Sequence, residues 1–270
     1  FKGLCERRFE DKDIMMEDKG IENKNERSII AALGVDTQGY KHVLGLREGA
    51  SENAEVVTDL LADLVDRGLT PERRRLFVID GSKALRAGIN RVFGSRTPVQ
   101  RCRIHKARNV LSYLPEDRKA DVEAAMKAAF KLKADEGIAK LRKLAEWLDR
   151  EYTSAAGSLR EGLDEMFTIN RLGLPKSLRR CLGSTNVIES PYSGVRAQTR
   201  RVKRWRGSSM ALRWTASALL SIEKRMRRIM GYQQLWILEA ALRNWTKKKA
   251  LPAKRRSPKL SVRSSHQTFN

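Results

Sequence analysis

The sequence is poor in cysteine, in acidic residues and in long apolar stretches, and each shortage excludes a class of protein. Its 270 residues include 3 cysteines, Cys5, Cys102 and Cys181, an odd number spread far apart. This argues against a disulfide framework and fits a reducing cytosol. No apolar run approaches the roughly 20 residues that span a bilayer, and no signal peptide opens the chain. We therefore expect a cytoplasmic protein without a membrane partner.

The shortage of acids gives the chain a strong and uneven positive charge. Against 55 Lys and Arg stand 32 Asp and Glu, for a formal net charge of +23. From Arg196 to the end there are 20 basic residues and 2 acids, so this end carries +18 of that charge. Such an excess indicates a polyanionic partner, most commonly nucleic acid. A basic structural protein that binds RNA or the ribosome would show a similar total and stays open as an alternative.

The hydrophobic content of 41% is enough for one core of ordinary size, and the order of elements is mixed α/β. The expected elements are, in chain order, strands at 29–35 and 42–46, a helix at 53–68, a strand at 76–79, a helix at 82–93, a strand at 99–101 and a basic helix up to Tyr113. From 116 to about 182, apolar residues recur at helical spacing, which predicts an all-helical insertion. Two further helices are expected at 208–229 and 235–245, the first with a basic face.

An acidic residue follows the buried strand at 76–79. Asp80 is succeeded by Gly81, and Asp-Gly is a common turn pair, so its carboxylate is either a turn former or a metal ligand.

A second isolated acid, Glu189, lies in the segment 183–190. Asn186 is a good N-cap and would place Glu189 at the third helical position, where it either caps the helix or binds a metal. Pro191 is tolerated in a first turn but leaves open a helix start beyond Glu189.

Two strings resemble signatures of the Mutator-type transposases of bacterial insertion sequences. They are VQRCRIHKARN at 99–109 and GSTNVIES at 183–190. In that family a strand-Asp-Gly unit and a helix precede the first string, and a Thr-Asn-x-Ile-Glu-Ser box carries the last catalytic carboxylate. The resemblance covers roughly residues 28–245. It implies a ribonuclease-H-like mixed sheet core, interrupted by an all-helical insertion and followed by basic C-terminal helices.

This resemblance divides the chain into five parts. They are a degenerate or partial first-strand region at 1–27, the first part of the core at 28–115, the helical insertion at 116–182, the completion of the core with the Glu189 helix and basic helices at 183–245, and a disordered basic tail at 246–270. The sequence opens at Phe1 without an initiator methionine and lacks the N-terminal helical DNA-binding region of full-length members. We therefore expect a truncated copy.

The chemistry that the resemblance implies is cleavage of a DNA strand by water and attack of the freed 3′-hydroxyl on target DNA. Both steps use two Mg²⁺ (or Mn²⁺) ions about 4 Å apart, held by hard oxygen ligands. The family's ligands are Asp, Asp and Glu, of which Asp80 and Glu189 match the last two. For the first, Asp18 is the best candidate because apolar residues precede it and a glycine follows closely. Glu17 and Asp13 are fallbacks.

The implied partners are duplex DNA, namely terminal inverted repeats and target DNA, bound on the bacterial nucleoid by a homodimer or a larger assembly. Candidates for phosphate contacts are Arg101, His105, Arg108, Arg196, Arg200 and Arg201.

Cys102 and His105 offer two potential zinc ligands, but no second pair stands at finger spacing. The resemblance instead implies a place near the catalytic centre.

The segment around Asp18 is degenerate, and Pro191 stands where the family usually has leucine. A catalytically inactive DNA-binding remnant is therefore the alternative function.

Overall fold

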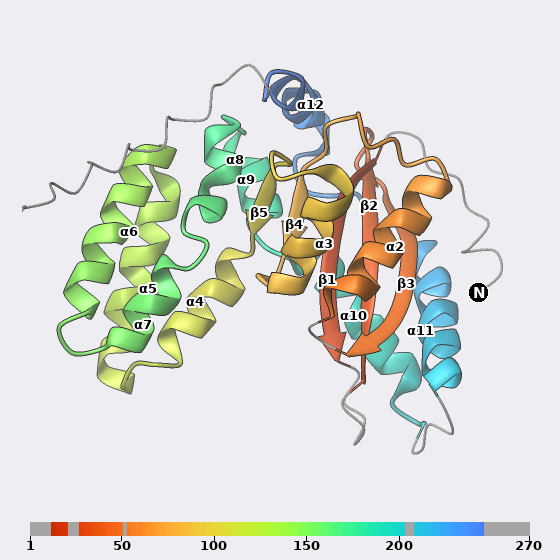
Figure 1. Ribbon diagram of the computed structural model, residues 1–270, viewed down its shortest axis with the longest axis horizontal. Helices are drawn as coiled ribbons and strands as arrows, with labels where there is room; N and C mark the ends of the chain where they lie inside the picture. Colours follow the sequence, from red (N-terminus) through yellow and green to blue (C-terminus); the bar gives the residue numbers. More distant parts are fainter. Residues whose placement is uncertain (1–11, 21–26, 51–52, 203–207, 246–270) are drawn as a thin grey trace, which may run out of the picture.

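One mixed sheet of five strands organises the fold, in the order β3-β2-β1-β4-β5 (Figure 1). The computed structural model describes residues 12–20, 27–50, 53–202 and 208–245. The strands are β1 Lys12–Gly20, β2 Arg27–Asp36, β3 Lys41–Ala50, β4 Phe77–Ile79 and β5 Val99–Arg101. β1, β2 and β3 are antiparallel neighbours, whereas β1, β4 and β5 run parallel.

The turn between β2 and β3 is fixed by Asp36. Its Oδ1 accepts hydrogen bonds from the backbone N–H of Gln38 and of Tyr40, both at 2.9 Å. Gly39 adopts a φ of 85°, which a residue with a side chain rarely does. The predicted hairpin is confirmed, and its strands extend beyond the predicted limits.

Both faces of the sheet are covered by helices. Helices α2 Ala54–Asp66 and α3 Lys83–Phe93 lie over one face, which we call the α3 face (Figure 1). Helices α10 Asn186–Thr199 and α11 Ser208–Glu223 lie over the other, the α10 face. Successive strand residues alternate between the two cores. Thus Ile30 packs with α2 and α3, whereas Ala31 belongs to the cluster under α10.

The predicted stretch between 116 and 182 is helical, and its part up to Phe167 forms a lobe beside the sheet (Figure 1). The lobe contains α5 Glu116–Lys131, α6 Ala134–Leu148, α7 Thr153–Arg160 and the 3-10 turn η1 Asp164–Phe167, whereas α8 Thr168–Arg171 and α9 Lys176–Leu182 pack into the core under α10. Helix α4 Arg103–Leu111 leads from β5 into this lobe, which has its own apolar core.

Residues after α7 return to cover the open edge of β5. Gln100 Nε2 donates to the Met166 carbonyl at 3.0 Å, and the Ile169 N–H donates to Gln100 Oε1 at 3.1 Å. Thr168 Oγ1 donates to the Val99 carbonyl at 2.6 Å. The edge strand is thereby protected and the lobe is fixed to the sheet.

The helix predicted at 208–229 is too long. α11 ends at Glu223, and the chain beyond it packs on the β2–β3 turn, where the Ile229 N–H donates to the Gly39 carbonyl at 3.0 Å. Ile229 is therefore buried by an irregular segment rather than by a helical face.

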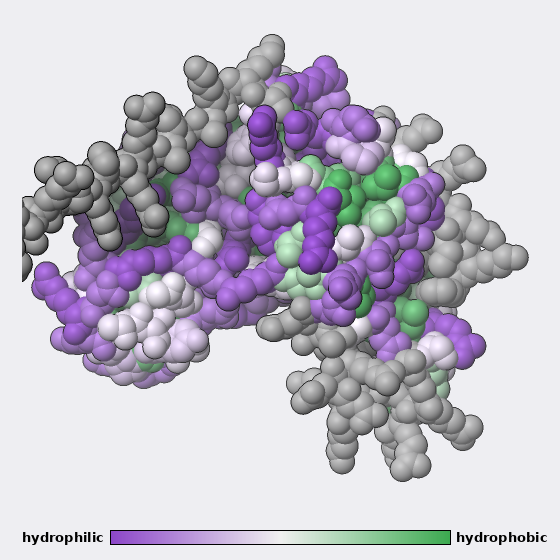
Figure 2. Space-filling model, in the orientation of Figure 1, coloured by the Kyte–Doolittle hydropathy of each residue, from purple (hydrophilic) through white to green (hydrophobic). Residues whose placement is uncertain are grey.

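The chain then forms the 3-10 turn η2 Tyr232–Gln234 and helix α12 Leu235–Arg243, which confirms the last predicted helix. The predicted basic tail at 246–270 and most of the region 1–27 lie outside the described residues. None of the described helices is both long and apolar enough to cross a membrane. Hydrophilic residues cover most of the face shown in Figure 2.

Candidate active site

Asp80 follows directly on β4, beside the central strand β1. Its Oδ1 accepts a hydrogen bond from the Ser82 N–H at 2.9 Å, and Ser82 Oγ in turn accepts from the Leu85 N–H and caps α3. Gly81 has a φ of 116°, so the sharp turn after Asp80 requires glycine. Asp80 is thus a turn former, and this turn holds its half-buried carboxylate at the end of the strand.

Glu189 comes from α10, which begins earlier than Pro191 suggested. The predicted cap at Asn186 is wrong, because Thr185 is the N-cap and Glu189 is the fourth helical residue. Pro191 lies inside the helix, where its missing N–H costs one intrahelical hydrogen bond. Buried Ile188 and Tyr192 hold the helix against the sheet in spite of this.

Thr185 connects Glu189 to the Cys-x-x-His segment. Thr185 Oγ1 donates to Glu189 Oε1 at 2.8 Å and lies 3.2 Å from His105 Nδ1. Cys102 is fully buried as the N-cap of α4, and its Sγ accepts from the Thr185 N–H at 3.4 Å and from the His105 N–H at 3.5 Å. Cys102 therefore joins α4 to α10.

The charges of this site act on His105. A hydrogen bond to Cys102 raises the pKa of His105, burial works against it, and the carboxylates of Glu189 and Asp80 raise it further. His105 Nδ1 lies 4.0 Å from Glu189 Oε1. Burial alone would raise the pKa of the Cys102 thiol, but hydrogen bonds with His105 and Thr185 hold that pKa below its usual value. Glu189 thus lies close to the imidazole, and the charge of Asp80 acts on the same ring.

The oxygens of Asp80 and Glu189 are the hard ligands that Mg²⁺ prefers. Among the side chains that the structure describes, no three His, Cys, Asp or Glu residues form a group that could hold a metal. A two-ion site needs a further carboxylate. The strand next to β4 that carries acidic residues is β1.

The register of β1 distinguishes its acids. Glu17 pairs with Ala31 of β2, a residue of the core under α10, whereas Asp18 pairs with Ile30 of the core under α2 and α3. Paired residues share a face of a sheet. Glu17 therefore stands on the α10 face and Asp18 on the α3 face. Met16 pairs with Ile79, so Glu17 and Asp80 each follow directly on the last pair between β1 and β4.

The predicted phosphate-binding residues lie in two kinds of environment. The exposed ones are Arg108 on α4, Arg196 on α10 and Arg200 and Arg201 at the end of α10. Arg101 is buried, with 6% of its side chain exposed, and forms ion pairs with Glu161 and Glu165.

Sequence reasoning missed the contacts of Thr185, although this residue begins the Thr-Asn box. It also did not single out Glu161 and Glu165, which lie within the stretch predicted as helical and form ion pairs with Arg101 of β5.

Comparisons with known proteins agree with the two sequence signatures. The family model described as "Transposase, Mutator family" matches residues 15–226. The chain is 26% identical over 200 residues to the transposase for insertion sequence element IS256 in transposon Tn4001 from Staphylococcus aureus, covering 73% of this chain and 50% of the relative. It is 28% identical over 176 residues to the transposase for IS6120 from Mycolicibacterium smegmatis, covering 65% of this chain and 53% of the relative.

A third relative is the transposase for IST2 from Acidithiobacillus ferrooxidans. It is 27% identical over 199 residues, which cover 73% of this chain and 66% of the relative. The chain spans about half the length of the first two relatives and about two thirds of the third.

Proposed function

Because the chain belongs to the Mutator family of transposases, we propose that it is the catalytic region of an insertion-sequence transposase. It cuts a DNA strand and joins the freed 3′ end to target DNA in the presence of a divalent metal. The observation that carries this proposal is that Glu189, which is hydrogen-bonded to Thr185, lies 4.0 Å from His105 of the Cys-x-x-His segment, while the charge of Asp80 acts on the same imidazole. The matched relatives are named as transposases for insertion sequences, which supports the same reaction here.

Asp80 and Glu189 would hold Mg²⁺ or Mn²⁺ through their carboxylate oxygens. Two bound metal ions would activate the attacking oxygen and stabilise the leaving oxygen. The protein itself needs no nucleophile. Its part is to hold these carboxylates through the turn at Gly81 and the hydroxyl of Thr185, and to keep a protonatable imidazole at His105 beside the substrate phosphate.

The third carboxylate comes from β1, for which the sequence favoured Asp18. The strand register favours Glu17 instead, since Glu17 shares the α10 face with Glu189 and, like Asp80, follows directly on the last pair between β1 and β4. Asp18 lies on the opposite face, where α2 and α3 cover the sheet. The set that we propose is therefore Glu17, Asp80 and Glu189.

The sheet supports a ribonuclease-H-like core. An antiparallel β1–β3 meander is followed by β4 and β5, which run parallel to β1, and acids stand on neighbouring strands at its centre. The helical lobe between β5 and α10 then corresponds to an insertion into that core.

Duplex DNA, at the terminal repeats and at the target, is the proposed partner. The exposed arginines on α4 and α10 flank the segments that carry His105 and Glu189, and they are suited to contact phosphates. A homodimer or larger assembly would hold two DNA ends at once. The bacterial nucleoid would be its place of action.

The two features that favoured an inactive remnant, the segment around Asp18 and Pro191, do not disrupt the elements to which they belong. β1 is a strand of 9 residues that pairs with β2 on one side and with β4 on the other. Pro191 lies within α10 and does not displace its start.

A strand-nicking and strand-transfer assay on supercoiled plasmid with Mg²⁺ or Mn²⁺ tests the proposal. We expect metal-dependent nicking that is abolished in Asp80→Asn and in Glu189→Gln. Lys127→Ala on α5 removes an exposed charge far from the site and serves as the matched control. Equal nicking by the wild type and Asp80→Asn would contradict the proposal, as would no nicking by any protein.

A further inference from the structure

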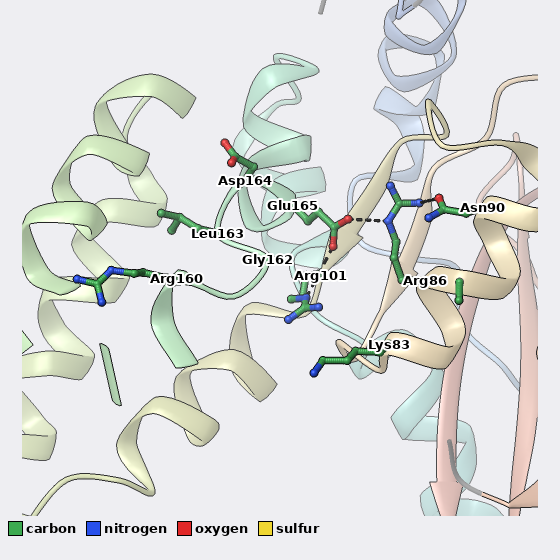
Figure 3. Close-up of a pocket in the computed structure, with 10 residues that line it drawn as sticks. Lys83, Arg86, Asn90, Arg101, Arg160, Gly162, Leu163, Asp164 and Glu165 are labelled. Atoms are coloured by element: carbon green, nitrogen blue, oxygen red, sulfur yellow. Dashed lines mark hydrogen bonds and ion pairs between the residues drawn. The ribbon is translucent and has the colours of Figure 1, made fainter. Parts of the chain in front are cut away.

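A polar cavity of about 430 Å³ lies between α3 and the loop that joins α7 to η1 (Figure 3). Lys83, Arg86 and Asn90 of α3 form one wall, and Gly162 and Glu165 belong to the other. Arg101 of β5 also lines it. The cavity adjoins the candidate active site, because a Cβ atom on Gly81, the residue after Asp80, would lie 3.5 Å from Arg101 Cδ and Nε.

Cations outnumber carboxylates around this cavity. Arg86 Nε pairs with Glu165 at 2.6 Å, and buried Lys106 pairs with Glu161 at 3.3 Å. Arg101 approaches the same two acids only at 3.5 and 3.7 Å, and Lys83 approaches Glu161 at 4.0 Å. Four cations thus share two carboxylates.

The remaining charges in the walls do not offset this excess. Arg160 pairs with Asp149, and Arg171 pairs with Asp164, so each of these pairs is neutral by itself.

Arg101 is the least satisfied of these cations. Only 6% of its side chain is exposed, and its Nε makes no hydrogen bond within the described structure. Its Nη1 reaches the Glu161 carbonyl at a long 3.4 Å. A guanidinium carries five N–H donors, and a buried charge with unfilled donors is costly unless a strong acceptor meets it. A phosphate group is such an acceptor.

The position of Lys83 points the same way. It is the first residue of α3, whose first turn contains no acid, and 89% of its side chain is exposed. The positive end of a helix disfavours a cation and favours an anion. Lys83 therefore extends a positive region from the helix start to Arg101 (Figure 3).

We propose that this cavity binds one backbone phosphate of the DNA strand that is held at the Asp80 site. Lys83 and Arg86 contact the phosphate from α3, and Arg101 contacts it from β5. The assignment of the anion to DNA rests on the proposed function. The cavity lies between the sheet and the helical lobe, so strand binding there would also fix the lobe relative to the catalytic carboxylates.

The test follows arginine Nε–H signals by NMR in the full chain during titration. One probe is inorganic phosphate, and the other is the dinucleotide TpT, whose single phosphate is a phosphodiester. Arg101→Lys identifies the Arg101 signal. Lys83→Ala is the test variant, because its exposed side chain can be removed without disturbing the fold, and Lys127→Ala is the control for the loss of one positive charge.

The expected result is a saturable shift of the Arg101 signal with both probes. Affinity should fall about fivefold in Lys83→Ala, the change that corresponds to about 1 kcal/mol, and should stay unchanged in Lys127→Ala. Saturation by inorganic phosphate alone would overturn the assignment to a DNA strand. No saturable shift, or equal weakening in both variants, would mean an adventitious ion only and overturn the site.

The plasmid assay separates this inference from the proposed function. If TpT binding depends on Lys83 but the protein does not nick DNA, the phosphate site is supported and the proposed function is wrong. If nicking depends on Asp80 but TpT does not bind at Arg101, the proposed function is supported and the phosphate site is wrong.

Discussion

Thr185 Oγ1 donates a hydrogen bond of 2.8 Å to Glu189 Oε1 across the first turn of α10. Thr185 is completely buried, and it also contacts Cys102 and His105, so one hydroxyl fixes the orientation of a proposed metal ligand relative to α4. The Cys-x-x-His signature thereby acquires a structural role, because Cys102 and His105 contact the threonine that holds the Glu189 carboxylate. Thr185 is in this sense a positioning residue.

Thr185→Val removes the hydroxyl while keeping the shape of the side chain. Groups that orient metal ligands typically contribute about 10-fold or more in metal affinity or activity, so we expect a loss of that size in Mn²⁺ affinity measured by calorimetry. Thr185→Ser keeps the hydroxyl and should retain most of the affinity. A loss of thermal stability with unchanged Mn²⁺ affinity in Thr185→Val would contradict the positioning role.

The register of β1 predicts opposite outcomes for two adjacent acids. Glu17→Gln should abolish nicking and weaken Mn²⁺ binding, because Glu17 shares the α10 face with Glu189. Asp18→Asn carries the same change in charge and should retain both properties, since Asp18 stands on the α3 face. Glu17→Asp tests whether the length of the side chain matters. Loss of Mn²⁺ binding in Asp18→Asn but not in Glu17→Gln would reverse the assignment.

Because of Glu161, the stability of the fold depends on pH in the acidic range. Burial alone would raise the pKa of Glu161, but Lys106, Arg101 and Lys83 outweigh it and hold that pKa below 4.5. Its stabilising effect is present above pH 4.5 and is lost as pH falls through the lowered pKa. At pH 7 Glu161→Gln should cost about 1 kcal/mol, because it leaves buried Lys106 without its carboxylate.

Thermal unfolding of Glu161→Gln and the wild type between pH 7 and acid measures this effect. The difference in Tm should shrink below pH 4.5. Glu123→Gln on α5 loses a pair with exposed Lys127 and should show almost no difference at any pH. A constant difference in Glu161→Gln down to the lowest pH would contradict the role of the ionised carboxylate.

The exposed arginines of α10 predict a change in the salt dependence of DNA binding. Each phosphate contact adds about 0.9 to the slope of log affinity against log salt concentration, so Arg196→Ala should lower that slope by about this amount. Arg142→Ala on α6 removes another exposed arginine, from the helical lobe, and should leave the slope unchanged. Fluorescence anisotropy with a labelled duplex at several salt concentrations measures it, and equal slopes in both variants would contradict a contact at α10.

Much of the fold was predictable because its signals are local. The strand predicted at 99–101 matches the limits of β5, and the helices between 116 and 182 followed from regular apolar spacing. Asp80 was identified because a charged residue ends a buried strand. The resemblance to the family then gave Glu189 a partner in the site.

What the sequence could not predict depends on contacts between distant segments. Asn186 is the better N-cap by intrinsic preference, but Thr185 is the N-cap in the folded chain, where Ile188 and Tyr192 of the following helix are buried. The residues of β1 show no alternation from which to read a face, so only pairing with Ile30 and Ala31 separates Asp18 from Glu17. The excess of cations around Arg101 arises from two segments that meet only in the folded chain.

The central claim is that Asp80 and Glu189 together hold divalent metal ions. Anomalous diffraction from crystals of the protein soaked in Mn²⁺ tests it most directly. We expect two peaks about 4 Å apart, each bound by at least one of these carboxylates, and neither peak in Asp80→Asn. Ordered Asp80 and Glu189 side chains without a manganese peak at either one would contradict the claim.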